Sequence, residues 1–179
     1  MRPGRKNASR KESDSWFTPA AWAARIRAAL GGAVDFDPCC ASPQHDAIKA
    51  EDGCLWPARD GLAERWRGRV YCNPPYSDMA RWWPKIAAEA ADTDRVSRLL
   101  ALVPLRPSSK WWRELAARAD FVGVPPRRIA FVSSETGLVA TTGRCELTFF
   151  GWRLAKPEAL QTIHMLIVRG LPGQGVLFP

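Results

Sequence analysis

The stretch that decides the fold runs from Arg69 to Trp83 and reads RVYCNPPYSDMARWW. Its first four residues predict a β-strand, and the two prolines end that strand because proline cannot donate a hydrogen bond to a sheet. Apolar residues at helical spacing follow and predict a helix, in which Pro84 fits best in the first turn. Asn73 and Tyr76 are not needed to end a strand, so they are candidate functional residues.

Upstream of this stretch, the sequence predicts one helix and one strand. Thr18 is a candidate N-cap with Pro19 at the first helical position, and Gly31-Gly32 end the helix. The segment AVDFDP then predicts a short strand that ends at Pro38. Residues 41–67 are irregular and indicate no element.

Downstream, the segment 98–104 (RLLALVP) is apolar on both faces, as in the buried centre of a parallel sheet. A helix capped by Ser108 or Ser109 and a strand DFVGV follow. The segments 127–132 and 144–152 alternate in polarity and are expected to form an antiparallel pair. Strands alternating with helices predict an α/β fold with a mostly parallel central sheet and an antiparallel C-terminal strand pair.

Two predicted strands end in residues of unusual chemistry, namely Asp37-Pro38 and Asn73-Pro74-Pro75-Tyr76. Ligands of parallel α/β sheets bind at the carboxyl ends of the strands, so we expect both segments to belong to one site. The Asn73 amide oxygen and the Pro74 carbonyl are two acceptors that can bind both hydrogens of an –NH2 group. Tyr76 can stack on a planar base, which must be flipped out of a duplex to reach such a pocket.

Several segments together resemble the phage-type DNA N6-adenine methyltransferases, which use S-adenosylmethionine and carry an NPPY motif. In chain order they are SWFTP (15–19), DFDPCCASP (35–43), DGLAERWRGRVYCNPPYS (60–77), PLRPSSKWW (104–112) and RRIAF (127–131). The resemblance implies a Rossmann-like class I methyltransferase fold and the transfer of a methyl group to adenine in DNA. The sequence CCAS stands where many adenine methyltransferases have a glycine-rich turn after Asp-Pro.

The resemblance also implies roles for individual residues. Those implied to hold the target adenine are Asn73, Pro74, Pro75 and Tyr76, and those implied to bind the cofactor are Trp16, Thr18, Pro19, Asp37, Pro38 and Asp60. Basic residues near the site are expected to contact DNA phosphates, namely Arg81, Arg106, Lys110, Arg127 and Arg128, of which Arg127 and Arg128 match the family's basic loop.

The composition favours a polyanionic partner, since the 179 residues carry a formal net charge of +8. The five cysteines and two histidines lack the spacing of a metal site, so no metal is expected. No apolar run is as long as a membrane span or forms a signal peptide, and we expect no membrane partner and a cytoplasmic protein, in a bacterial or phage-infected cell.

We expect three regions: a disordered basic arm over 1–14, the methyltransferase domain over 15–169 and a flexible tail over 170–179. In the tail, Gln174, Leu177 and Phe178 resemble the Q-x-x-L-F peptide that docks on the bacterial sliding clamp.

Other readings of the sequence stay open. One is an amino methyltransferase that acts on RNA or on protein glutamine. Another is a nucleic-acid-binding relative that has lost catalysis.

Overall fold

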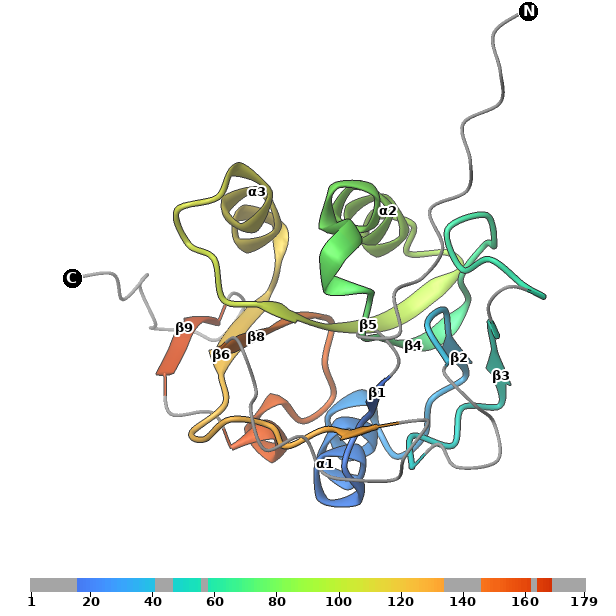
Figure 1. The fold of residues 1–179 in the computed structure, drawn as a ribbon, viewed down its shortest axis with the longest axis horizontal. Helices are drawn as coiled ribbons and strands as arrows, with labels where there is room; N and C mark the ends of the chain where they lie inside the picture. Colours follow the sequence, from blue (N-terminus) through green and yellow to red (C-terminus); the bar gives the residue numbers. More distant parts are fainter. Residues whose placement is uncertain (1–15, 41–46, 56–57, 134–145, 162–163, 169–179) are drawn as a thin grey trace, which may run out of the picture.

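The computed structural model describes residues 16–40, 47–55, 58–133, 146–161 and 164–168. Within these residues a central sheet has seven strands (Figure 1). In sheet order they are β3 (Asp52–Gly53), β2 (Phe36–Asp37), β4 (Gly68–Cys72), β5 (Val96–Pro104), β8 (Leu147–Trp152), β6 (Phe121–Val124) and β9 (His164–Val168).

The strand directions follow from the pairings. Strands β3, β2, β4 and β5 pair in parallel, whereas β8 is antiparallel to both β5 and β6, and β9 is antiparallel to β6. Five strands therefore run one way, and their carboxyl ends share one edge of the sheet. This mixed sheet, mostly parallel with antiparallel C-terminal strands, confirms the predicted Rossmann-like α/β fold.

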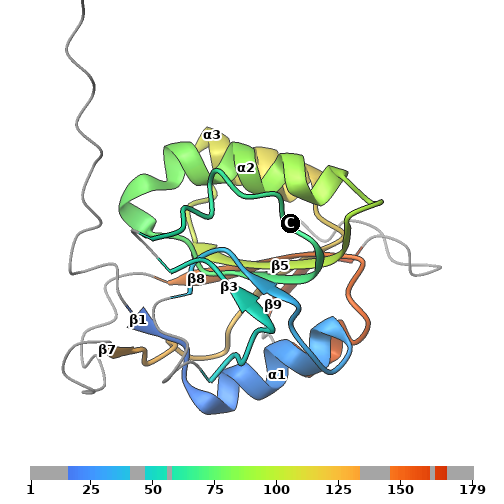
Figure 2. The same cartoon turned by 90° about the vertical axis from the view of Figure 1, so that its right-hand side faces the viewer.

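The sheet lies between two layers of other elements (Figures 1 and 2). Helices α2 (Met79–Ala91) and α3 (Lys110–Arg118) cover one face. The other face carries α1 (Ala20–Leu30), the 3₁₀ turn η3 (Pro157–Leu160) and a small ribbon of β1 (Trp16–Phe17) and β7 (Val132–Ser133). The carboxyl edge of the sheet is thus bounded by elements on both faces.

Alternating side chains of the central strands fill two separate cores, one on each face. In β4, Val70 and Cys72 point to the α2–α3 side while Tyr71 points to the α1 side. In β5, Leu99 and Ala101 face one core and Leu100 the other. Burial on both faces explains why this strand is an unbroken apolar run, as the sequence predicts.

The start of the first helix differs from the prediction. Helix α1 begins at Ala20, so Pro19 holds the N-cap position, and its carbonyl accepts hydrogen bonds from the backbone N–H groups of Trp22 and Ala23, both at 2.9 Å. The Thr18 hydroxyl instead lies 3.1 Å from the hydroxyl of Tyr71 in β4. Thr18 therefore joins the helix entry to the sheet rather than capping the helix.

Two further expectations are wrong. Pro84 lies inside α2 and not in its first turn, because the helix begins five residues earlier at Met79. The segment 127–132 does not pair with the strand after it: β7 is antiparallel to β1, while β8 enters the central sheet between β5 and β6. The wide apolar surface of β8 buries better between two strands than on the short ribbon.

The predicted basic arm (1–14) and C-terminal tail (170–179) lie outside the described residues, so both stay predictions, as do the domain limits at 15 and 169.

Candidate active site

The register of the sheet brings the two predicted strand-end motifs to the same edge. Strands β2 and β4 are parallel neighbours, with Phe36 opposite Val70. Asp37-Pro38 and Asn73-Pro74 therefore follow adjacent strands at the carboxyl edge. This is where a Rossmann-like sheet binds its ligands.

The Asn-Pro-Pro-Tyr segment forms a compact turn with an internal hydrogen bond. The Tyr76 hydroxyl donates to Oδ1 of Asn73 at 2.8 Å. Pro74 is buried, while the side chains of Asn73 and Tyr76 are half-buried. The chain then enters the 3₁₀ turn η2 (Tyr76–Asp78), whose Asp78 N–H donates to the Pro75 carbonyl at 3.0 Å, and continues directly into α2. The motif is thus fixed between a buried strand and a helix.

Asp37 is buried and supports the turn that follows β2. Its Oδ1 accepts a hydrogen bond from the backbone N–H of Cys39 at 2.8 Å, and its carbonyl accepts one from the N–H of Cys54 at 2.9 Å. Its side chain is 5 % exposed. Such local bonding of a carboxylate to the backbone two residues on stabilises a tight turn.

The turn after Asp37 lacks glycine, but glycines of neighbouring segments let the backbone approach it. A Cβ on Gly61 would lie 2.0 Å from the carbonyl oxygen of Pro38, which no real contact allows. A Cβ on Gly53 would lie 2.9 Å from Cβ of Cys40. Gly53 and Gly61 therefore let the neighbouring segments pack directly against the turn after Asp37.

Asp60 reaches the site through this contact, because it precedes Gly61. Its Oδ1 accepts a hydrogen bond from the backbone N–H of Leu62 at 3.0 Å, and its carbonyl accepts those of Ala63 and Glu64. The structure thus brings Asp37, Pro38, Asp60 and the Asn-Pro-Pro-Tyr turn to one edge. Gly61 is not among the residues predicted from the sequence, although its place directly after Asp60 marks a turn.

Among the described residues, four buried cysteines lie at or near this edge: Cys39, Cys40, Cys54 and Cys72. The sulfurs of Cys39 and Cys72 are 3.8 Å apart and join the ends of β2 and β4. Burial raises the pKa of the Cys72 thiol, and it raises the pKa of Cys54 to about 11. Such thiols stay protonated near neutral pH and are poor nucleophiles, so these two cysteines fit a packing role.

The N-terminal segment contributes the remaining candidate cofactor residues. Trp16 lies in β1, paired with Ser133 of β7, and Thr18 is buried with its hydroxyl on Tyr71. Tyr71 immediately precedes Cys72 and Asn73 in β4. The segment 16–19 is therefore tied to the same strand that carries the Asn-Pro-Pro-Tyr turn.

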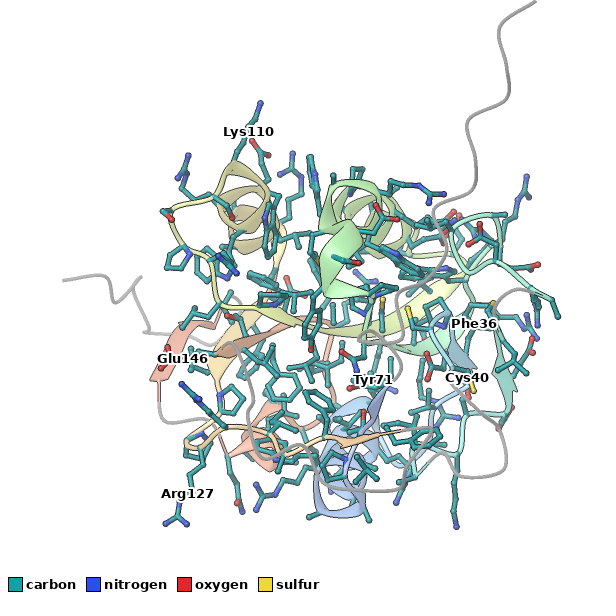
Figure 3. The ribbon with its side chains drawn as sticks, viewed as in Figure 1. Phe36, Cys40, Tyr71, Lys110, Arg127 and Glu146 are labelled. Carbon is teal, nitrogen blue, oxygen red and sulfur yellow. The ribbon has the colours of Figure 1, made fainter. Side chains whose placement is uncertain are left out.

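The predicted DNA-contacting residues are all exposed, and they occupy both faces of the sheet. Figure 3 shows Lys110 on α3 and Arg127 on the opposite side, next to the α1 layer. Arg106 follows β5, and Arg128 follows β6, so both extend from the carboxyl edge. Arg81, in the first turn of α2, donates to Asp78 at 3.1 Å and has a side chain that is 56 % exposed.

Gln174, Leu177 and Phe178 lie outside the described residues, so the clamp-docking hypothesis stays a prediction. In the part of the chain that the structure describes, no group of three or more His, Cys, Asp or Glu side chains is arranged to hold a metal ion. No helix within the described ranges has the length and apolar character needed to cross a bilayer.

A Rossmann-like sheet with Asp-Pro and Asn-Pro-Pro-Tyr on adjacent strand ends is the arrangement expected of a methyltransferase. The chain matches the DNA N-6-adenine-methyltransferase (Dam) family over residues 5–166, and it belongs to that family. A search of curated proteins found no match.

Proposed function

We propose that this protein transfers the methyl group of S-adenosylmethionine to the N6 amine of an adenine that is flipped out of double-stranded DNA, at a specific sequence. The observation that carries the proposal is the fixed Asn73–Tyr76 pair at the end of β4, next to the Asp37-Pro38 turn of β2. The family match supports DNA adenine as the substrate.

Asn73 and Pro74 supply the acceptors for the amine. The Asn73 amide oxygen has two lone pairs, and the Tyr76 hydroxyl occupies one of them, so the other is able to accept an N6 hydrogen. The Pro74 carbonyl accepts the second hydrogen, and Pro74 and Pro75 have no N–H that competes for it. Two such bonds pull the amine toward pyramidal geometry and make its lone pair more nucleophilic.

Tyr76 has two tasks in this proposal. Its hydroxyl fixes the Asn73 amide before the base arrives, and its ring provides a stacking surface for the adenine. Orienting the acceptors in advance lowers the entropy that must be lost when the reacting atoms are aligned.

The residues present fit S-adenosylmethionine, which when bound supplies an electrophilic methyl group on a positively charged sulfur. Asp37 and Asp60 bring carboxylates to the end of β2, where they are suited to an ammonium group or to ribose hydroxyls. Oδ2 of Asp60 has no partner among the described residues. Trp16, Thr18, Pro19 and Pro38 complete the pocket in this assignment.

The exposed cations on both faces of the edge are suited to a duplex that crosses the site. Arg81, Arg106 and Lys110 would contact phosphates on the α2–α3 side, and Arg127 and Arg128 those on the α1 side. Such a protein acts where bacterial or phage DNA is present, in the cytoplasm. Docking on a sliding clamp through Gln174, Leu177 and Phe178 would add a second attachment to replicating DNA.

The test is incubation with duplex DNA and S-adenosylmethionine, followed by mass spectrometry of the nucleosides and sequencing of the modified positions. We expect N6-methyladenine at one recognition sequence. Asn73→Ala should lower kcat by roughly 10²–10³-fold, as the loss of one catalytic hydrogen-bonding group does.

Other outcomes decide between the alternatives. Methylated cytosine would contradict the assigned base, and methyl groups found only on RNA or protein glutamine would show a different amino methyltransferase. Binding of DNA without binding of S-adenosylmethionine, measured by calorimetry, would indicate a relative that has lost catalysis.

A further inference from the structure

We propose that Gly61 and Trp66 are positioning residues for the Asp37-Pro38 turn, and that they thereby set the affinity for S-adenosylmethionine. The inference rests on the proposed function. Neither residue is proposed to contact the cofactor. Gly61 packs directly against the turn, and Trp66 holds Gly61 in place, so both act on the cofactor through the turn.

The contact between Gly61 and Pro38 is the first step. The backbone of residue 61 lies so close to the Pro38 carbonyl that a Cβ would be 2.0 Å from that oxygen and 2.8 Å from both the carbonyl carbon and Cβ of Pro38. Two of these atoms belong to the backbone, so no side-chain rotation relieves the overlap. Any larger residue at this position must displace the turn that is proposed to bind the cofactor.

Trp66, five residues after Gly61, holds the Gly61 carbonyl in place. Its indole Nε1–H donates to the Gly61 carbonyl at 2.8 Å, and Trp66 is fully buried. The ring also lies against Trp82 of α2, with a centroid separation of 6.4 Å. The carbonyl of Gly61 is therefore held in one orientation by a buried donor that α2 supports.

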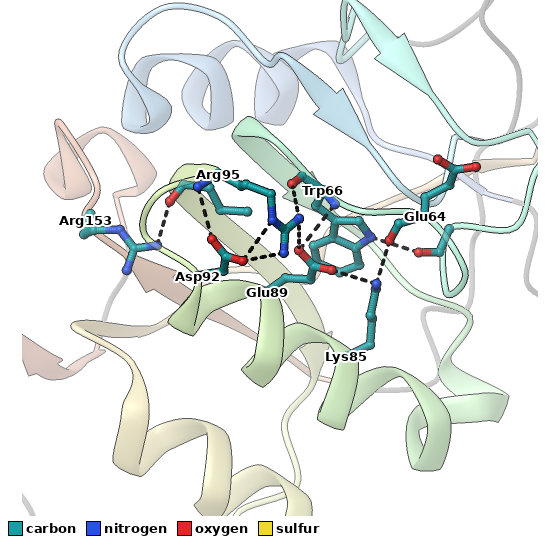
Figure 4. Close-up of polar contacts among 9 residues, drawn as sticks. Glu64, Trp66, Lys85, Glu89, Asp92, Arg95 and Arg153 are labelled. Carbon is teal, nitrogen blue, oxygen red and sulfur yellow. Dashed lines mark hydrogen bonds and ion pairs between the residues drawn. The ribbon is translucent and has the colours of Figure 1, made fainter.

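Helix α2 holds Trp66 through a buried carboxylate (Figure 4). Glu89 is 5 % exposed, and its Oε2 accepts from the Trp66 backbone N–H at 3.3 Å and from Arg95 at 3.2 Å. Its Oε1 accepts from Lys85 at 2.7 Å, and the same ammonium donates to the Glu64 carbonyl at 2.6 Å. The two cations compensate the buried charge, so the network is both satisfied and rigid.

These contacts connect the two halves of the site through one element. Helix α2 begins directly after the Asn-Pro-Pro-Tyr turn, and its later residues hold the segment that supports the Asp37-Pro38 turn. Helix α2 thereby helps to fix the position of the Asp37-Pro38 turn relative to the Asn-Pro-Pro-Tyr turn. A methyl donor and acceptor must be aligned within a fraction of an ångström, and one such shared support serves that need.

The experiment measures the dissociation constant of S-adenosylmethionine by calorimetry in the absence of DNA, and duplex affinity by fluorescence anisotropy. Trp66→Phe keeps one aromatic ring but removes the smaller ring that carries the N–H donor, and we expect cofactor binding to weaken by roughly fivefold or more, since the lost hydrogen bond alone accounts for that much. Gly61→Ala should weaken it by more than about tenfold, and should raise KM for the cofactor more than it lowers kcat. Duplex affinity should not change for either variant.

The chain offers matched controls at the opposite edge of the sheet. Trp152 is also buried and also donates its indole N–H to a backbone carbonyl, that of Arg118, at 2.8 Å. A Cβ on Gly151 would lie 2.5 Å from Cδ1 of Leu154, so Gly151→Ala forces that side chain to move and perturbs packing away from the site. Trp152→Phe and Gly151→Ala should lower stability and leave cofactor affinity unchanged.

Wild-type affinity in both Gly61→Ala and Trp66→Phe would overturn the inference and leave the proposed function standing. Equal losses of affinity in the Trp66 and Trp152 variants would also overturn it, because they would show a general effect of stability. A wild-type chain that binds no S-adenosylmethionine would overturn the proposed function, and the inference with it.

Discussion

At the scale of single residues, the Asn73–Tyr76 hydrogen bond is the feature on which the proposed catalysis depends most directly. The donor and acceptor are three positions apart, and the turn through Pro74 and Pro75 brings them within 2.8 Å. Because prolines restrict the backbone dihedrals, the entropy lost on forming this turn is small. The motif thus holds the Asn73 amide in one orientation without a ligand.

Changing Tyr76 separates its two tasks. Tyr76→Phe removes the hydroxyl that orients Asn73 but keeps the ring, so kcat should fall by about two- to tenfold, the range expected for one hydrogen bond. Tyr76→Ala removes the stacking surface as well and should cost at least about tenfold more. Steady-state kinetics with duplex DNA measures both. Equal activity of Tyr76→Phe and Tyr76→Ala would contradict the role given to the ring.

Residues of the site differ in how well the sequence predicts them. Asn73 and Tyr76 carry chemistry that a strand end does not require, and Asp37 follows a recognisable strand. Gly61 and Trp66 were missed because their importance comes from contacts with Pro38 and Glu89, which lie more than twenty positions away in the sequence. No local pattern contains that information.

At the scale of elements, β2 and β4 are fastened at the edge opposite the site. Asp35 precedes β2, and its carboxylate accepts hydrogen bonds from the guanidinium and the backbone N–H of Arg69 in β4, the latter at 2.7 Å. Gly68 allows the approach, since a Cβ there would lie 2.3 Å from Oδ2 of Asp35. This pairing fixes the register that brings the two strand-end motifs together.

The Asp35–Arg69 pair predicts a pH dependence of stability. The hydrogen bonds from Arg69 hold the pKa of Asp35 below its usual 3.8, so the stabilisation is complete above that value and is lost as the pH falls through the lower folded pKa. Asp35→Asn should lower the free energy of unfolding at pH 7 by about 1–2 kcal/mol, and the gap to wild type should shrink below about pH 4.

Urea denaturation at pH 7 and at pH 3 checks this expectation. Glu114→Gln is the control, because Glu114 pairs with Arg118 on the surface of α3, where solvent screens the pair, and little change is expected. A gap between Asp35→Asn and wild type that stays constant down to pH 2 would count against the pair as the cause.

The elements predicted well are those with a clear local signal in the sequence. The strands β4 and β5 and the end of α1 at Gly31 follow from apolar runs and a glycine in the left-handed region. Strands of two residues, such as β3 and β7, are too short to show a period, so their partners depend on tertiary packing. Pro84 was expected in the first turn of the helix because the sequence does not show that α2 begins at Met79, directly after the 3₁₀ turn η2.

At the scale of the whole molecule, the consequence of the net charge of +8 depends on where the exposed basic side chains lie. The strands β2, β4, β5 and β6 all end at one edge, and the exposed cations Arg106, Lys110, Arg127 and Arg128 follow two of them. A duplex lying across that edge would meet basic side chains on both faces of the sheet. The charge would then raise the rate of association with DNA as well as the affinity.

Comparing two lysines tests this placement. Lys110 begins α3 at the carboxyl edge, whereas Lys156 follows β8 at the opposite edge. The backbone N–H of Lys156 donates a hydrogen bond to the Ala29 carbonyl. Lys110→Ala should weaken duplex binding and make the slope of log K against log salt concentration less negative by about 0.9, the value for one phosphate contact. Lys156→Ala removes the same charge and should leave the slope unchanged.

Fluorescence anisotropy at several salt concentrations measures both slopes. Identical slopes for the two variants would show that the charge acts through the net field of the protein and not through contacts at this edge.

The thiol contact between Cys39 and Cys72 provides an intrinsic reporter for motion of the strand end that carries the Asn-Pro-Pro-Tyr turn. Both sulfurs are enclosed where β2 and β4 end, and Cys72 is bonded directly to Asn73. An alkylating reagent such as iodoacetamide gains access to Cys72 only while the strand ends are transiently apart. The rate of its labelling, read by peptide mapping, therefore reports the opening of the two strand ends, without any probe being introduced.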